Sequence, residues 1–434
     1  MVAYTNPVTT KKKGNKIKDS SFHILWHSAR IGAESNSGRV LAHLPFLELV
    51  NICRIVNIFN IEFKLTFMDV FKSIRRTLEN VDGDVFHLHQ GKLYDEPKPR
   101  DDFGSDFSLL IEPQIHSDNG GEKALLSLVS DYFLGPHNAS SSIALSNGGT
   151  NALWLAFSVL TKSSSPIVQA LSPYWMYLPG VINHSGGIMN EISTICGHKL
   201  LSEDEILASV KKAITKETSV IYIANPTNPV GNLFSPEFIT RMTEYCESLD
   251  GYLVVDHAYY AFTCKDNPTG LIPLLDQAYI HPRIVNTFTF SKLLGVPGLR
   301  LGFLQGPKQI IDRVAALYRY SNYTPNSYSQ SVIFEYLRNS NFLLGRQQKY
   351  KENLAIYQLI MSGIGPTPEG GFFSFIPLAE DISVQSLLQQ GIGIVDGRLF
   401  GKDFDHWARI CFTSESPDRL TFSLKKLLSI IKEK

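Results

Sequence analysis

From about residue 140 onward, short apolar runs alternate along the chain with segments of helical periodicity. Helical patterns occupy residues 150–160 and 235–249, and Ser235 followed by Pro236 is typical of a helix start. Strand-like apolar runs occur at 141–146, at 165–175 (passing into a loop), and at 219–226, 252–259 and 283–290. Strands this apolar are typical of a sheet covered on both faces. The pattern therefore predicts an α/β fold with a mainly parallel sheet.

The segments on either side of this region follow other patterns. Helical spacing at 67–80 and 122–134 predicts two helices, a short strand is predicted at 85–92, and the Pro-, Asp- and Gly-rich segment 95–120 is predicted to be a loop. Beyond residue 321, helices are predicted at 330–339 and 383–391 and strands at 371–378 and 406–412, which together indicate a smaller α+β domain. Residues 1–60 show no clean period and are predicted to be a partly disordered extension.

Composition narrows the class of protein. The 434 residues are 44% hydrophobic and 19% charged, and 41 Lys and Arg balance 41 Asp and Glu, so no global charge favours nucleic acid or an anionic membrane. The most apolar stretch, 44–63, carries Glu48, Arg54 and Glu62 and is a poor membrane span, and no signal-peptide pattern follows the basic start. Five scattered cysteines without CxxC spacing indicate neither a zinc site nor a disulfide framework, and a cytoplasmic location is expected.

Polar residues follow the predicted strands, and in open α/β sheets ligands bind at the carboxyl ends of strands. After the run at 141–146 come Gly148, Gly149 and Thr150, which open a helix. Glycines let the backbone approach an anion closely, and a helix N-terminus offers free N–H groups. This turn suggests a phosphate cradle, although such turns are also common in proteins without one.

Further candidates follow the later strands. Asn228 follows the run at 219–226, Asp256 and Tyr259 close the next run, and Lys292 and Arg300 come after the last. Each has an ordinary structural interpretation as a turn former, a helix cap, a salt-bridge partner or a surface charge. Together they suit one ligand with a phosphate, a basic ring nitrogen, a phenolate oxygen and an aldehyde that reacts with an amine, which is pyridoxal 5′-phosphate.

Several blocks resemble the signatures of class I/II aminotransferases of the aspartate aminotransferase-like, fold type I superfamily. They are NPVG (228–231), DHAYY (256–260), SKLLGVPGLRLG (291–302) and the SPYW loop (172–175), and the likeness spans about residues 85–412. The resemblance implies an α/β fold with a large domain, built on a mainly parallel sheet of the seven-stranded type, and a smaller α+β domain. The expected regions are an extension (1–60), the N-terminal part of the small domain with a substrate-side loop (61–115), the large cofactor-binding domain (116–320) and the C-terminal small domain (321–434).

The resemblance assigns roles around the cofactor ring. Lys292 resembles the Schiff-base lysine, which also carries the proton of the substrate α-carbon. Asp256 resembles the partner of the ring nitrogen, and Asn228 and Tyr259 resemble the donors to the ring oxygen. Trp175 resembles the residue that stacks on the ring, with the neighbouring tyrosine at 174 as the alternative.

The resemblance also assigns the two ends of the site. Gly148, Gly149, Thr150, Thr289 and Arg300 are expected around the phosphate. On the substrate side, Arg409 is similar to the arginine that binds an α-carboxylate as a two-pronged fork. Gly91 lies in a segment (87–97) that is similar to the substrate-side glycine loop, and Asn228 is expected to contact the substrate as well.

The sequence departs from the family pattern at three places near the expected site. His257 stands where the family usually has a glutamate, and it is either a buried structural histidine or a change in the electrostatics of the site. His116 stands near the place of a tyrosine that reaches the partner subunit's phosphate site. His87, His89 and Lys92 are unusual polar residues in the substrate-side loop, where they could line a polar pocket or simply face solvent.

These features favour transfer of an amino group between an amino acid and a 2-keto acid. An alternative on the same residues is elimination, replacement or cyclisation, for example of a hydroxylated arginine-type amino acid in specialised metabolism. A third alternative is a regulatory module that binds the cofactor without turnover. Regulators of this kind carry an N-terminal winged DNA-binding domain, and residues 1–60 are too short to form one. The resemblance implies a homodimer with shared active sites, and no metal, nucleic-acid or membrane partner is expected.

Overall fold

The computed structural model describes residues 68–97, 109–110, 116–118, 120–135, 141–162, 164–264 and 274–432. The predicted N-terminal extension and most of the predicted loop at 95–120 lie outside the described residues. Contacts divide the chain into units 1–69 and 70–434, and the fold below is that of the second. Within the described residues, no helix has both the length and the apolar character needed to cross a membrane.

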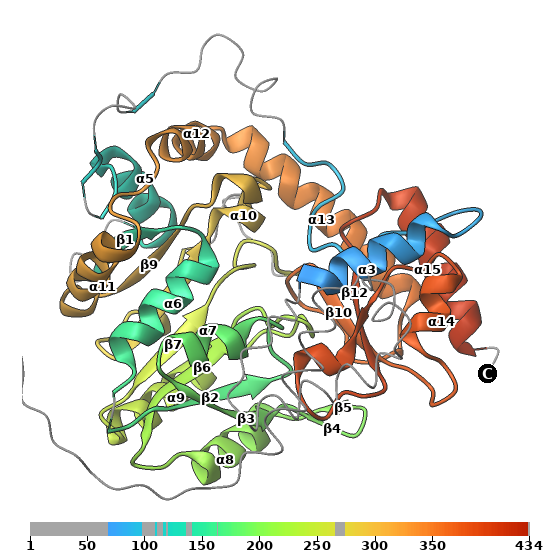
Figure 1. Ribbon diagram of the computed structural model, residues 1–434, viewed down its shortest axis with the longest axis horizontal. Helices are drawn as coiled ribbons and strands as arrows, with labels where there is room; N and C mark the ends of the chain where they lie inside the picture. Colours follow the sequence, from blue (N-terminus) through green and yellow to red (C-terminus); the bar gives the residue numbers. More distant parts are fainter. Residues whose placement is uncertain are drawn as a thin grey trace, which may run out of the picture. The chain divides into compact units, whose positions relative to one another are not determined.

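A seven-stranded sheet forms the centre of this unit, with strand order β1-β9-β8-β7-β6-β2-β3 (Figure 1). Its strands are β1 (Ser141–Ser146), β2 (Ile167–Ser172), β3 (Ile188–Ser193), β6 (Thr218–Ala224), β7 (Tyr252–Asp256), β8 (Ile284–Thr289) and β9 (Gly302–Pro307). All neighbours are parallel except β9, which runs antiparallel to both β1 and β8. The predicted mainly parallel sheet is confirmed. The sequence pattern predicted no strand at β3 or at β9. In β9 only Phe303 and Leu304 are apolar, and the glycines and proline at its two ends are weak strand formers.

Helices cover both faces of this sheet, which explains why its strands are apolar throughout. In β7, Val254 packs on the face covered by α6 (Gly149–Leu160), α7 (Leu178–His184) and α11 (Lys308–Ser321). Leu253 and Val255 pack on the opposite face, against α5 (Lys123–Phe133), α8 (Glu203–Ala213), α9 (Pro236–Ser248) and α12 (Ser327–Arg338). Ser235 caps α9 by accepting a hydrogen bond from the Phe238 N–H, so the predicted helix start is confirmed.

A second, antiparallel sheet has the order β10-β12-β11, with β10 (Phe373–Pro377), β11 (Val395–Asp396) and β12 (Trp407–Cys411). In the sequence, α13 (Ser340–Ile360) precedes this sheet, α14 (Val384–Gln389) lies between β10 and β11, and α15 (Pro417–Lys432) follows it, whereas α3 (Met68–Glu79) comes before the strands of the large sheet. A two-stranded hairpin, β4 (Ile195–Cys196) and β5 (Lys199–Leu200), completes the strands of the described residues.

The strand predicted at 85–92 is wrong. Only Phe86 forms a β-bridge, with Ile392, and the following residues turn. The backbone there hydrogen-bonds instead to the end of β12 and the residues after it. The Cys411 N–H donates to the carbonyl of Leu88 at 2.6 Å, and the Thr413 hydroxyl donates to the carbonyl of Lys92 at 2.7 Å. These bonds hold the predicted substrate-side loop against the end of β12 in the small antiparallel sheet.

Candidate active site

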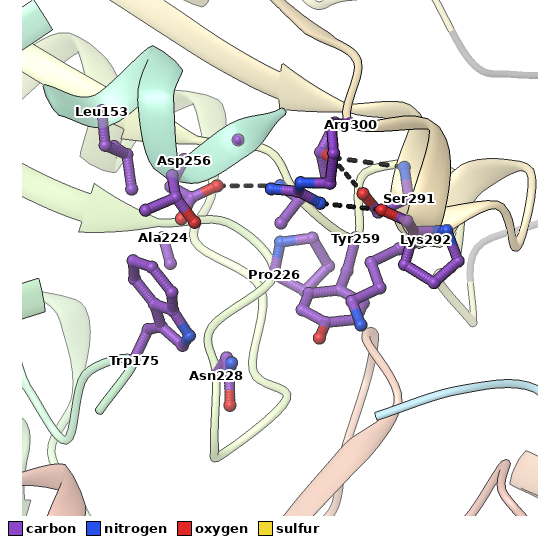
Figure 2. Close-up of a pocket in the computed structure, with 15 residues that line it drawn as sticks. Leu153, Trp175, Ala224, Pro226, Asn228, Asp256, Tyr259, Ser291, Lys292 and Arg300 are labelled. Carbon is purple, nitrogen blue, oxygen red and sulfur yellow. Dashed lines mark hydrogen bonds between the residues drawn. The ribbon is translucent and has the colours of Figure 1, made fainter. Parts of the chain in front are cut away.

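A cavity of about 220 Å³ lies at the ends of β6, β7 and β8. Figure 2 shows its side chains, which come from these strand ends, from α6, from the short helix α10 (Phe290–Leu293) and from the loops that carry Trp175, Asn228 and Arg300. The residues that line it are Gly149, Thr150, Leu153, Trp175, Ala224, Pro226, Asn228, Asp256, Ala258, Tyr259, Thr289, Ser291, Lys292, Pro297 and Arg300. Most of the predicted site residues therefore meet in one cavity, as expected for residues at the carboxyl ends of neighbouring strands.

One end of the cavity is shaped to receive an anion. Helix α6 begins after Gly148, whose positive φ of 81° suits glycine, and no side chain caps the first turn. A Cβ placed on Gly148 would lie 2.6 Å from a guanidinium nitrogen of Arg300, and one on Gly149 would lie 3.2 Å from Cβ of Thr289. A side chain larger than hydrogen at position 148 or 149 would therefore occupy the space at this end of the cavity. Free helix N–H groups beside a guanidinium form a binding site for phosphate.

Asp256 ends β7 with its carboxylate at the cavity wall. Its Oδ1 accepts the Ala258 N–H at 3.0 Å, and its Oδ2 accepts the Tyr222 hydroxyl at 3.1 Å. Burial raises the pKa of Asp256 to about 6, and these two hydrogen bonds, which favour the charged form, oppose the shift. The carboxylate is thus costly to keep charged until a cation faces it.

Tyr222 is a residue that the sequence patterns did not single out. It lies in the middle of β6, one strand from Asp256, and its side chain is 1% exposed. In the β6–β7 register, Tyr222 faces Val254 and Ala224 faces Asp256, so the hydroxyl reaches along the sheet to the carboxylate. A tyrosine two residues before the end of a strand that borders the aspartate strand is the signal that could have found it.

Lys292 is the third residue of the four-residue helix α10, and its side chain lines the cavity. The ammonium nitrogen donates to the carbonyl of Gly91 at 2.6 Å, so the predicted substrate-side glycine does meet the predicted lysine. Burial is the main cause that lowers the pKa of Lys292, and the charges of Arg409 and Arg300 lower it further. The opposing influences come from Glu96 and from the thiol of the buried cysteine at 411. A buried lysine of this kind is suited to act as a base.

Aromatic and amide side chains form the other walls. Tyr259 is 5% exposed and packs edge-on against Phe372 and Phe373, with ring centroids 5.2 and 5.5 Å apart. Trp175 lines the cavity (Figure 2), whereas the alternative candidate, Tyr174, donates its hydroxyl to Glu191 at 2.7 Å and packs in the core. The structure therefore brings Trp175, rather than its neighbour, to the cavity.

Arg409 lies in β12 and reaches the cavity through Asn228. Its guanidinium donates to Asn228 Oδ1 and to the carbonyl of His89, both at 3.3 Å, and stands 4.0 Å from the centroid of the Phe373 ring. The side chain is only 4% exposed, and its buried Nε finds no hydrogen-bond partner among the described residues. A buried guanidinium with donors to spare is a receptor for a carboxylate.

The departures from the family pattern prove mostly structural. His257 is 2% exposed, with its ring nitrogens 3.2 Å from the Asn225 carbonyl and 2.9 Å from Asn286 Oδ1, so the interpretation as a buried structural histidine is favoured. His116 is exposed and meets the ring of Tyr323 edge-on at 4.8 Å. The side chains at 87, 89 and 92 do not line the cavity, although the backbone of their loop does contact Lys292 and Arg409.

Comparisons with known proteins agree with this geometry. The family model "Aminotransferase class I and II" matches residues 112–424. Aspartate/prephenate aminotransferase of Thermus thermophilus is 26% identical over 283 residues, which are 62% of this chain and 70% of that protein. Aspartate aminotransferase of Thermotoga maritima is 24% identical over 290 residues, 66% of this chain and 74% of that one.

Solved structures share the fold. The crystal structure of the Thermotoga maritima aspartate aminotransferase has a TM-score of 0.69 to this chain at 20% identity, covering 84% of this chain and 96% of that one. A double mutant of the Thermus thermophilus aspartate aminotransferase also scores 0.69, at 19% identity and with the same coverage. The predicted fold, a seven-stranded mainly parallel sheet with a smaller antiparallel sheet, is confirmed.

Proposed function

Since the chain belongs to the class I and II aminotransferase family, whose enzymes use pyridoxal 5′-phosphate, we propose that this cavity holds the cofactor and catalyses amino transfer. One observation carries the proposal. The anion-binding start of α6, a carboxylate facing the cavity, and a buried lysine converge on a single space. The substrates are then an amino acid and a 2-keto acid.

The residues present fit this cofactor. The uncapped start of α6 with Thr150, Thr289 and Arg300 would hold the phosphate, where added Cβ atoms would take the space. Asp256 would face the ring nitrogen, whose positive charge would keep the carboxylate ionised despite burial. In the same way, Asn228 and Tyr259 would hold the ring oxygen, Trp175 would cover one face of the ring, and Lys292 would bond to the aldehyde.

The chemistry divides between the cofactor and the chain. When bound, pyridoxal 5′-phosphate supplies an electron sink for negative charge at the substrate α-carbon. Lys292 removes the α-proton as a free amine, and burial lowers its pKa toward the range in which this amine is available. Arg409 fixes the α-carboxylate and so orients the bond that breaks.

A product assay separates amino transfer from its alternatives. The full-length protein with added cofactor would be given one amino acid at a time, with and without a 2-keto acid acceptor, and the products followed by mass spectrometry. Amino transfer gives the matching 2-keto acid in proportion to the acceptor. An elimination or cyclisation proceeds without an acceptor, and a regulatory module consumes no amino acid, so either result would overturn the proposal.

Arg409→Lys should weaken the binding of the α-carboxylate, because an ammonium cannot reproduce the paired donors of a guanidinium. Losing a hydrogen bond to a charged group costs about 1.5–3 kcal/mol, so kcat/KM should fall about 10- to 100-fold, chiefly through KM. Steady-state kinetics with varied amino acid measures this. Arg398→Lys is the control, since that half-buried arginine pairs with Asp396 in the same small sheet. An unchanged KM in Arg409→Lys would contradict the assignment.

Tyr222→Phe should raise the pKa of Asp256 further, because it removes a hydroxyl donor from the carboxylate. If the pKa of Asp256 rises by about one unit, the affinity for pyridoxal 5′-phosphate near neutral pH should fall about tenfold, because fewer molecules carry the charged carboxylate. Equilibrium titration of the cofactor-free protein across pH 5–9 measures both effects. Tyr357→Phe is the matched control, because it removes an equally buried hydroxyl that bonds Ser374 in another core. Equal affinities in the two variants would show that the Tyr222 hydroxyl does not act on the site.

We further propose a homodimer and a cytoplasmic location. Exposed aromatic side chains support a second copy of the chain: Tyr320 is 90% exposed, and Tyr323 and Tyr328 are each 50% exposed, at the end of α11 and the start of α12. The molar mass in solution, measured by light scattering, tests the dimer. The division into 1–60, 61–115, 116–320 and 321–434 likewise remains a proposal, which limited proteolysis can test at its boundaries.

A further inference from the structure

Helix α10, which carries Lys292, is too short to hold itself in place. It spans four residues, so the carbonyls of Lys292 and Leu293 come at its C-terminal end, where a helix has no partners of its own to offer. A side chain from α13, far along the chain, satisfies both. Arg346 donates from Nε to the Leu293 carbonyl at 3.0 Å and from a terminal nitrogen to the Lys292 carbonyl at 3.1 Å.

The same guanidinium faces the substrate-side loop. Arg346 is 4% exposed, and its remaining terminal nitrogen is buried without a hydrogen-bond partner among the described residues. A Cβ placed on Gly295 would lie 2.6 Å from that nitrogen and 2.6 Å from Glu96 Oε2, so the two charged groups flank this glycine. The positive φ of 72° at Gly295 suits the same residue type.

Glu96 in turn belongs to the loop that receives the tip of Lys292. Its Oε1 accepts the Leu93 N–H at 3.0 Å, which folds the loop back on itself, and Gly91 in that loop accepts the Lys292 ammonium. Burial raises the pKa of Glu96, and the charges of Arg346 and Lys292 oppose this shift. The interactions therefore run in a circuit. Hydrogen bonds join the Lys292 backbone to Arg346, Glu96 to its own loop, and that loop to the Lys292 side chain, and the attraction between the charges of Arg346 and Glu96 closes the circuit.

We propose that Arg346 and Glu96 are positioning residues that hold Lys292 at both ends. Arg346 holds the backbone carbonyl of Lys292, and Glu96 holds the loop of Gly91, which accepts the Lys292 ammonium. The inference rests on the proposed role of Lys292 as the reacting amine. A guanidinium suits the task because its planar fork reaches two neighbouring carbonyls while its charge faces the carboxylate. Glu96 also acts on Lys292 by charge, raising the pKa of the amine against the lowering by burial and by the arginines at 300 and 409.

The chain offers a matched control. Asp95 and Lys349 form an ion pair between the same loop and the same helix α13, but on the surface, with side chains 60% and 36% exposed. Asp95→Asn therefore loosens the loop from α13 without touching Lys292. It is compared with Glu96→Gln, Arg346→Lys and Arg346→Met in the full-length protein.

The first readout needs no cofactor. Cofactor-free protein is labelled with trace acetic anhydride across pH 6–10, and labelling of Lys292 is compared by peptide mass spectrometry with that of exposed Lys308. Glu96→Gln should label Lys292 about three- to tenfold faster at pH 7.5, because removing the carboxylate lowers the pKa of the amine. In Arg346→Met the lysine should lose its protection at every pH, Arg346→Lys should lie between, and Asp95→Asn should match the wild type.

The second readout is the kcat of the cofactor-loaded protein. A displacement of about 1 Å can cost about 10²-fold, so Arg346→Met should lose about that factor in kcat with little change in KM, and Arg346→Lys should recover part of it. If Glu96→Gln and Arg346→Lys match Asp95→Asn in labelling and kcat, and only melting temperatures fall, the two residues are purely structural and the proposal is wrong. A wild type that makes no keto acid would instead refute the proposed function, while the labelling still reports on Arg346 and Glu96.

Discussion

Replacing Lys292 with alanine is expected to abolish amino transfer, lowering kcat by about 10⁴-fold or more. The substitution removes both the amine that bonds to the cofactor and the base that carries the α-proton, and a positioned base alone contributes about 10²–10⁴-fold. Formation of the 2-keto acid from an amino acid, followed at saturating acceptor, measures the loss. The cofactor should also leave the variant on gel filtration.

The comparison needs a lysine that is only a surface charge. Lys308 begins α11, pairs with Asp312 one turn later, and is 72% exposed in its side chain. Lys308→Ala should therefore retain the wild-type rate. If Lys292→Ala turned over at that rate too, Lys292 would be no more than a buried structural lysine, and the site would have to be assigned elsewhere.

Asp256→Asn is expected to weaken binding of pyridoxal 5′-phosphate by about 10²–10³-fold. The amide leaves the ring nitrogen without its counter-charge, and breaking one partner of a buried ion pair costs about 3–5 kcal/mol. The activity should fall with it, because a neutral ring is a weaker electron sink. Equilibrium titration with the cofactor measures the affinity, and an affinity within threefold of the wild type would show that Asp256 faces something other than the ring.

Although Asp256→Asn should weaken cofactor binding, it should raise the free energy of unfolding of the cofactor-free protein above pH 6. The pKa of Asp256 is about 6 in the folded protein against 3.8 in its ordinary range, so the folded state binds the proton more tightly than the unfolded state. The wild type therefore loses stability as pH rises from about 4 to about 6, by at most about 3 kcal/mol. Asp256→Asn should escape this loss and unfold at higher urea concentration than the wild type at pH 8, but not at pH 4. Parallel urea curves at the two pH values decide it.

The central sheet and the residues at its strand ends could be predicted because both follow from local pattern. An apolar run that is buried on both faces belongs to a sheet covered by helices on both sides. The residue that follows such a run lies at the carboxyl end of the strand, where ligands bind in these sheets. Asp256 and Gly149 were found in this way, since Asp256 ends a strand and Gly149 begins a helix, whereas Thr289 was assigned by the family resemblance alone.

Other features depend on contacts that local pattern does not contain. Tyr222 looks like one more apolar strand residue until the register of β6 and β7 brings its hydroxyl to Asp256. Arg346 lies in α13, a helix that the sequence pattern did not predict, and its partners are carbonyls more than 50 residues earlier. The segment at 85–92 has the composition of a strand, but it makes isolated tertiary hydrogen bonds at Phe86 and Leu88 instead of a ladder, and these bonds decide its conformation.

The hydrogen bond from Thr413 to the carbonyl of Lys92 joins positions 321 residues apart. A ribosome adds about 5–20 residues per second, so roughly 15–60 s separate the synthesis of the two partners. During that interval the loop of Gly91 has left the ribosome but has no β12 to hold it, while the strands and glycines of the cofactor site are already made. The growing chain can therefore complete its phosphate-binding end well before the carbonyl that faces Lys292 is fixed, and the finished site is among the last features of the protein to form during translation.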